Sequence, residues 1–178
     1  MALSTNNIIA LAFGALAFIL LANAYFPNLF LFLIIVTVGL FSKYYKAIYA
    51  VSFLIVDMTD FLVVLIFYKL GFSYALAAVF IFGYFYLVTG LFGNEGPTDA
   101  TSRTLGLLIS TLSLLVITNL YDPFMVSVIF VTLSGLIWGT NQIVTFHIIN
   151  PIYYPIVLCR TAVYWRFLPY LLPFLGIA

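Results

Sequence analysis

Long apolar runs, in which hydrophobic residues do not alternate with polar ones, make up most of this chain. The clearest cover residues 7–26, 47–68, 72–92 and 104–120, and a helix needs roughly 20 apolar residues to cross a bilayer. In lipid, only helices and closed barrels satisfy every backbone polar group, and runs without alternation favour helices. The pattern therefore predicts an all-α, polytopic integral membrane helical bundle.

Charge is too scarce to cover the surface of a soluble protein. Only 6% of the 178 residues are charged, whereas soluble domains have about a quarter. The mean hydropathy is +1.25. The net charge of +1 excludes the dense basic face that nucleic acid requires. The expected solvent and first partner of this chain is therefore the lipid bilayer.

Proline and polar residues mark the boundaries of the predicted spans. Pro27 ends the first span, and Asp122-Pro123 predicts an N-cap followed by proline at the first helical position. The second span is short enough to be a tilted helix or a re-entrant arm. We expect about six transmembrane helices, at residues 7–26, 28–41, 47–68, 72–92, 104–120, and from 123 to 140 or 149.

The C-terminal residues 152–178 are apolar but contain three prolines, so they predict either a seventh span or a broken or interfacial helix. The connections are short, which predicts a single transmembrane domain over residues 1–178. Its main hydrophilic loop is expected at residues 93–103, and a polar aromatic turn at residues 43–46. The positive-inside rule favours a cytoplasmic N-terminus.

Asp57 and Asp60 lie near the middle of the apolar run 47–68. A carboxylate at membrane depth is costly, and such a group is a candidate functional residue by default. A spacing of three places both acids on nearly the same helix face, where like charges oppose double ionisation. We therefore expect at least one to be neutral, and both to be hidden by neighbouring helices.

The functional interpretation of the acids is a proton, ion or polar-substrate site. The chain offers five basic partners for it: Lys69, Arg103, His147, Arg160 and Arg166. Two structural interpretations compete with it. The acids could be protonated and join helices through hydrogen bonds, or the third span could break near Asp57 so that both acids cap a helix at the membrane interface.

Metal and cofactor chemistry has little support in the sequence. His147 is the sole histidine and Cys159 the sole cysteine, too few for a bis-histidine haem or a zinc site. His147 is expected at the membrane interface, and the alternative is a single axial ligand shared with another subunit. No motif selects a cofactor, whose identity the sequence leaves open.

Small residues at helical spacing predict close helix packing. Gly135 and Gly139 form a GxxxG pattern, which permits helices to approach closely. We expect this pattern to serve packing inside the bundle in preference to contact with another chain.

Three functions remain open. The first is a non-catalytic hydrophobic subunit of a multi-subunit membrane complex, such as an energy-transducing one of respiratory type, with other membrane subunits as partners. The second is a small transporter or solute-binding transport component that uses Asp57 and Asp60. The third, ranked last, is a membrane enzyme acting on lipid. The chain lacks a complete catalytic motif, so we expect no catalytic activity of its own.

Overall fold

The computed structural model describes residues 26–49, 58–89, 97–146 and 153–177, and over these residues the protein is all-helical with no strand. This confirms the all-α prediction for the described part of the chain. The six helices are α2 (Pro27–Tyr49), α3 (Thr59–Leu70), α4 (Phe72–Thr89), α5 (Pro97–Ile117), α6 (Pro123–Phe146) and α7 (Tyr153–Phe174). The predicted first span, residues 7–26, lies outside the described residues except for Phe26.

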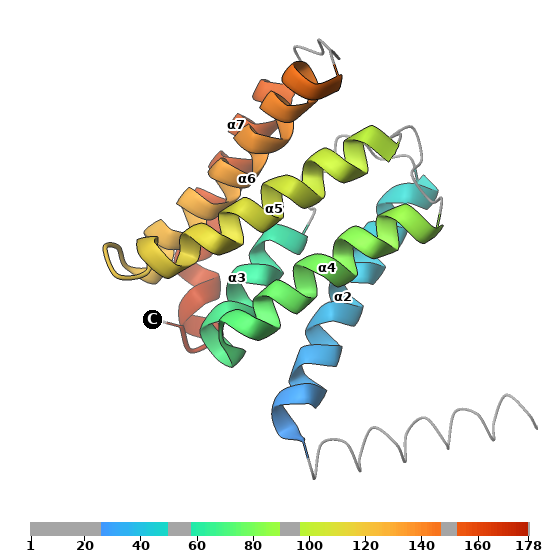
Figure 1. Ribbon diagram of the computed structural model, residues 1–178. Helices are drawn as coiled ribbons and strands as arrows, with labels where there is room; N and C mark the ends of the chain where they lie inside the picture. Colours follow the sequence, from blue (N-terminus) through green and yellow to red (C-terminus); the bar gives the residue numbers. More distant parts are fainter. Residues whose placement is uncertain (1–25, 50–57, 90–96, 147–152, 178) are drawn as a thin grey trace, which may run out of the picture.

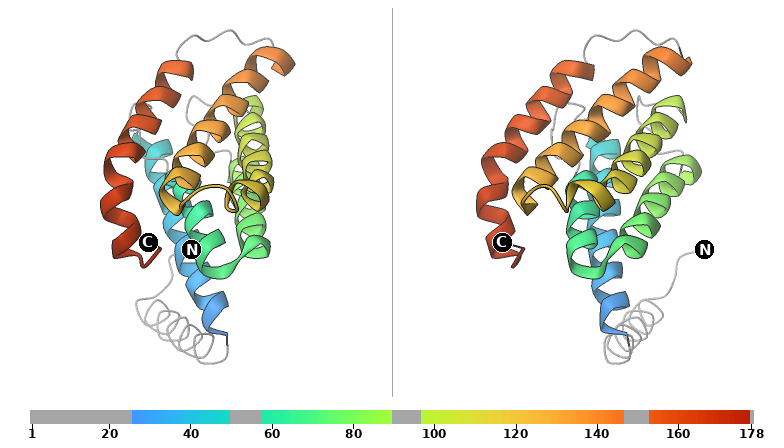
Figure 2. Two further views of the ribbon diagram at one scale, coloured as in Figure 1. Left: turned by 90° about the vertical axis from the view of Figure 1, so that its left-hand side faces the viewer. Right: turned by 60° about the vertical axis from the view of Figure 1, so that its left-hand side comes forward.

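Helix α3 occupies the centre of the bundle, where α2, α4, α5 and α6 all contact it (Figure 1). Every residue from Thr59 to Ile66 is buried. Successive helices run antiparallel, and α5, α6 and α7 lie side by side in the views of Figures 1 and 2. A polar residue in the first turns of α3 is therefore excluded from the surroundings of the protein by the helices around it.

The start of α6 follows the prediction from Asp122-Pro123. Pro123 is the first helical residue, and the Met125 backbone N–H donates to Asp122 Oδ1 at 2.9 Å. Proline fits here because the first N–H groups of a helix have no partner within the helix, and the Asp122 side chain satisfies one of the others.

Replacing Asp122 with alanine is expected to cost about 1 kcal/mol of stability, because the N–H of Met125 loses its acceptor. Asp122→Asn keeps a side-chain oxygen at the same place and should retain most of the stability. Thermal unfolding of the two variants in detergent measures the difference, and equal losses would show that the negative charge matters and the cap does not.

Two predicted boundaries around α2 and α3 are wrong. The turn predicted at residues 43–46 is helical, because α2 continues to Tyr49; lysine and tyrosine do not stop a helix, and neither glycine nor proline interrupts this stretch. The predicted third span, 47–68, is not one helix. Residues 47–49 belong to α2, and α3 begins at Thr59 with Met58 as its N-cap.

Helix α5 begins earlier than the sequence suggested. It starts at Pro97, so residues 97–103 of the predicted hydrophilic loop form its first two turns. The polar composition of these residues predicts a loop, whereas proline at the first position and hydroxyl and carboxyl groups in the first turn are also typical of a helix start.

Gly71 alone separates α3 from α4, and its φ of +97° is a conformation that residues with a side chain rarely adopt. Its N–H donates to the carbonyls of Ile66 and Phe67, which ends α3. The chain reverses here within one residue, and α4 begins at Phe72 as predicted.

Length and apolarity single out one membrane-spanning candidate among the described residues, Pro123–Thr145 in α6, of which half is buried inside the protein. Shorter apolar stretches occur in α2, α4 and α5. The C-terminal segment forms one helix, α7, despite Pro169 and Pro173 inside it. The described residues thus form a helical bundle.

Candidate functional site

A buried ion pair joins α3 to α7. Asp60 lies in the first turn of α3 and Arg160 in the second turn of α7, and their exposed fractions are 0% and 4%. Arg160 Nη2 contacts Asp60 Oδ2 as a salt bridge. The pairing is the one expected for an ionised carboxylate, because removing a lone charge from water is far more costly than removing a matched pair.

Helix α6 contributes the second contact of Asp60. Ser134 Oγ donates to Asp60 Oδ1 at 3.2 Å, so both carboxylate oxygens have a partner. One turn further along α7, the ring of Tyr164 stacks on Phe61 with centroids 6.4 Å apart. Asp60 thus has contacts from two other helices, and the three helices meet at its carboxylate.

Long side chains, and not close backbones, connect α3 with α7. Among the described residues no Cα of α3 lies within 8 Å of a Cα of α7. The arginine bridges this separation at the start of α3, and at the other end Lys69 donates from Nζ to the carbonyl of Gly176, in the turn that follows α7, at 3.1 Å. The position of α7 against α3 therefore depends on side-chain contacts, which include these two cations and the stacking of Tyr164 on Phe61.

The contact of α6 with α7 is close and has a regular antiparallel register. A Cβ on Gly135 would lie 2.7 Å from Val157 Cγ2, and the hydroxyls of Thr132 and Thr161 are 3.0 Å apart. Further along, the rings of Phe124 and Trp165 meet edge to face at 5.0 Å. This register places Arg160 level with the middle of α6, where Ser134 lies.

A second polar cluster lies between α5 and α6. Arg103 is 3% exposed, and its guanidinium carbon lies 5.5 Å from the ring centroid of Trp138, the geometry of a cation–π contact. Next to it, Asn141 Nδ2 donates to Ser102 Oγ at 2.7 Å. Arg103 thus belongs to the α5–α6 contact near the start of α5.

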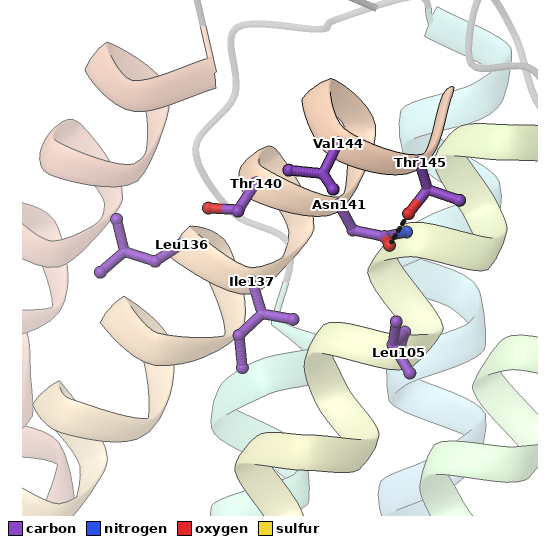
Figure 3. A pocket seen from close by; sticks show the side chains of 7 residues that line it. All are labelled: Leu105, Leu136, Ile137, Thr140, Asn141, Val144 and Thr145. Atoms are coloured by element: carbon purple, nitrogen blue, oxygen red, sulfur yellow. Dashed lines mark hydrogen bonds between the residues drawn. The ribbon is translucent and has the colours of Figure 1, made fainter. Parts of the chain in front are cut away.

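An open pocket of about 330 Å³ lies beside this cluster, between α5 and the C-terminal half of α6 (Figure 3). Its wall is mostly aliphatic. The polar groups of Asn141 and Thr145 in the wall bond to each other at 2.7 Å. The lining residues are Leu105, Leu136, Ile137, Thr140, Asn141, Val144 and Thr145. None belongs to the ion pair, so this pocket is separate from the Asp60 site.

The structure brings only some of the predicted site residues together. It brings together Asp60 and Arg160, whereas Asp57 and His147 lie outside the described residues. The other basic residues have other surroundings: Lys69 contacts Gly176, and Arg166 is exposed on α7. The glycines of the GxxxG pattern are both buried, and Gly135 contacts α7.

Sequence reasoning missed the hydroxyl and aromatic partners of these charges. Ser134 and Trp138 lie within the apolar helix α6, and no motif marks either of them as the partner of a charge. The available signal was weak: Ser134 and Trp138 are four apart, so they share one face of α6. Within the described residues, no group of three or more His, Cys, Asp or Glu gathers that could hold a metal ion.

Comparison with protein-family models, with curated proteins and with solved structures found no match.

Proposed function

We propose that the protein is an integral membrane helical bundle that acts as a non-catalytic subunit of a larger membrane assembly. Its support is the large apolar outer surface of the bundle. The interior contains an apolar core together with three buried charged side chains, Asp60, Arg103 and Arg160, and large apolar side chains also cover much of the outside. The surface of a soluble protein rarely carries large contiguous apolar patches.

The buried polar residues lie on four helices, α3, α5, α6 and α7. They are Thr59, Asp60, Ser102, Arg103, Ser110, Thr111, Ser127, Ser134, Gln142 and Arg160. The outer surface instead carries aromatic and aliphatic side chains, among them Phe174, Leu158 and Phe41 with exposed fractions of 86%, 70% and 68%. Lipid tails or apolar helices of another subunit are the surroundings that such a surface fits.

The role of the ion pair in this proposal is structural. Asp60 already has Arg160 and Ser134 as partners, so its charge is used to hold α3, α6 and α7 in one arrangement. Helix α7 contacts the rest of the bundle chiefly through α6, and its other face is available to a neighbouring subunit.

Purification from its own membrane in mild detergent tests the assembly. We expect other membrane proteins to elute with this chain in fixed stoichiometry, and to be lost when the outer face of α7 is changed by Leu158→Gln and Phe167→Gln. A matched pair of changes on the outer face of α5, Leu112→Gln and Val116→Gln, serves as the control. A lone, monodisperse chain with a normal bundle would contradict the subunit role.

The second candidate function is transport of a proton, an ion or a small polar solute, and the observation that favours it is the same buried pair. Charged side chains in the interior of a membrane bundle often mark a transport path. Transport would require the Asp60–Arg160 contact to open during each cycle, whereas a structural pair stays closed.

Asp60→Asn distinguishes the two functions, because asparagine preserves the shape of the side chain and removes its charge. In a transporter the variant should assemble but lose flux in proteoliposomes. In a structural subunit it should weaken the bundle. Unchanged flux together with unchanged assembly would exclude both roles for Asp60.

A further inference from the structure

Two buried hydroxyls on α5 and α6 are satisfied within their own helix. Thr111 Oγ1 donates to the Leu107 carbonyl and Ser127 Oγ to the Pro123 carbonyl, each at 2.7 Å. Ser110 is different: its side chain is fully buried, and its Oγ has no hydrogen-bond partner among the described residues. A buried polar atom of this kind requires an explanation, because leaving it unpaired costs free energy.

Arg160 of the ion pair also has a buried polar atom without a hydrogen-bond partner among the described residues. Arg160 directs Nη2 to Asp60, but its Nε is buried and makes no hydrogen bond within the described part of the chain. A guanidinium has five N–H donors in a rigid plane, and one carboxylate shared with Ser134 does not use them all.

Ser110 lies near the contact between α5 and α6 at Ser134. A Cβ on Gly106 of α5 would lie 2.5 Å from the Ser134 carbonyl oxygen, and the hydroxyl of Ser134 bonds to Asp60. Ser110 is four residues after Gly106, so it lies on the same face of α5, one turn away. Both unpaired atoms are therefore buried inside the bundle, Arg160 Nε in the residue that pairs with Asp60 and Ser110 Oγ one turn of α5 from the contact with Ser134.

We propose that this interior holds ordered water, with one molecule accepting from Arg160 Nε and water likewise bound to Ser110 Oγ. The ligand has to be neutral, because Asp60 and Arg160 compensate each other and a further ion would be an unpaired charge away from solvent. Buried water of this type binds to polar groups that the protein leaves unsatisfied, usually through about three hydrogen bonds. The Asp60–Arg160 pair is then a hydrated centre within an apolar bundle.

A density map that resolves other buried waters tests the proposal directly. We expect density within hydrogen-bond distance of Arg160 Nε and of Ser110 Oγ. A second crystal grown in bromide distinguishes water from an anion: water gives no anomalous signal at these positions. An anomalous peak there, or no density at either atom, would overturn the proposal.

Thermal unfolding in detergent provides an independent test, because the two explanations predict opposite changes in Tm for one substitution. If Ser110 binds water, Ser110→Ala removes a partner of that water, and Tm should fall by roughly 2–4 °C. If Ser110 is unpaired, the same change removes a buried unsatisfied group, and Tm should rise. Ser113→Ala is the matched control, because Ser113 Oγ donates to the Ser110 carbonyl at 2.7 Å. A rise in Tm for Ser110→Ala would contradict the proposal, whatever the control does.

Discussion

Arg160→Met is expected to destabilise the bundle by about 3–5 kcal/mol, because it leaves the Asp60 carboxylate buried without a countercharge. For a chain of this length that loss lowers Tm by on the order of 10 °C. Ser134 cannot compensate, since one neutral hydroxyl replaces only part of the lost interaction. Helix α7 should loosen from α3 first, because α3 and α7 connect through side chains alone.

Two further variants separate the loss of a charge from the loss of a long side chain. The double variant Asp60→Asn with Arg160→Met removes both charges and should recover much of the stability, since no uncompensated ion remains. Arg166→Met changes an exposed arginine six residues further along the same helix and should have little effect. Thermal unfolding of all three in one detergent is the measurement. A double variant as unstable as Arg160→Met would show that the charge of Asp60 is not the cause.

Gly106→Leu is expected to disrupt the contact between α5 and α6, the second large effect. Even the first carbon of a side chain at this position would lie 2.5 Å from the Ser134 carbonyl oxygen, and a backbone atom of a packed helix cannot turn aside as a side chain can. Gly106→Ala should cost about 1–3 kcal/mol, and leucine more. Because Ser134 also bonds to Asp60, displacement of α6 should weaken the ion pair too.

Gly135→Ala is the matched comparison, because its new Cβ would meet the side chain of Val157 and not backbone. Adding Val157→Ala should restore the stability lost in Gly135→Ala, whereas no single side-chain truncation should rescue Gly106→Ala. Unfolding temperatures and size-exclusion profiles of the variants check both statements. Tolerance of Gly106→Leu without loss of stability would refute the close approach of α5 and α6.

Sequence reasoning predicted the fold well where a local signal is strong. Asp122-Pro123 marked the start of α6 because the cap and the proline act within four residues. It failed where tertiary packing overrides local pattern. The apolar run at 47–68 has no glycine or proline, so a break near Asp57 could be given only as an alternative to a continuous span, although α3 begins at Thr59. The polar residues 97–103 have the composition of a loop, and the contacts of Ser102 and Arg103 with α6 are visible only in the folded chain.

The candidate site was predictable in its chemistry but not in its pairing. A central aspartate in an apolar run needs a partner, and Arg160 was among five basic residues considered. Asp60 and Arg160 are 100 positions apart, and only the arrangement of α3, α6 and α7 selects one arginine over the others. Ser134 could not be identified in advance, because a serine in an apolar helix usually bonds to its own backbone.

Cys159 offers the most direct measurement of the central claim, which is that a lipid-facing bundle encloses the ion pair. It is the only cysteine and is exposed on α7. It lies between Val157 and Thr161, which contact the middle of α6, and so at the expected mid-depth of a bilayer. In intact membranes a water-soluble, impermeant maleimide should leave Cys159 unmodified, although the thiol is exposed, while the denatured protein should react completely. Rapid labelling of the native chain from water, or recovery of the chain as a soluble monomer, would contradict the membrane bundle.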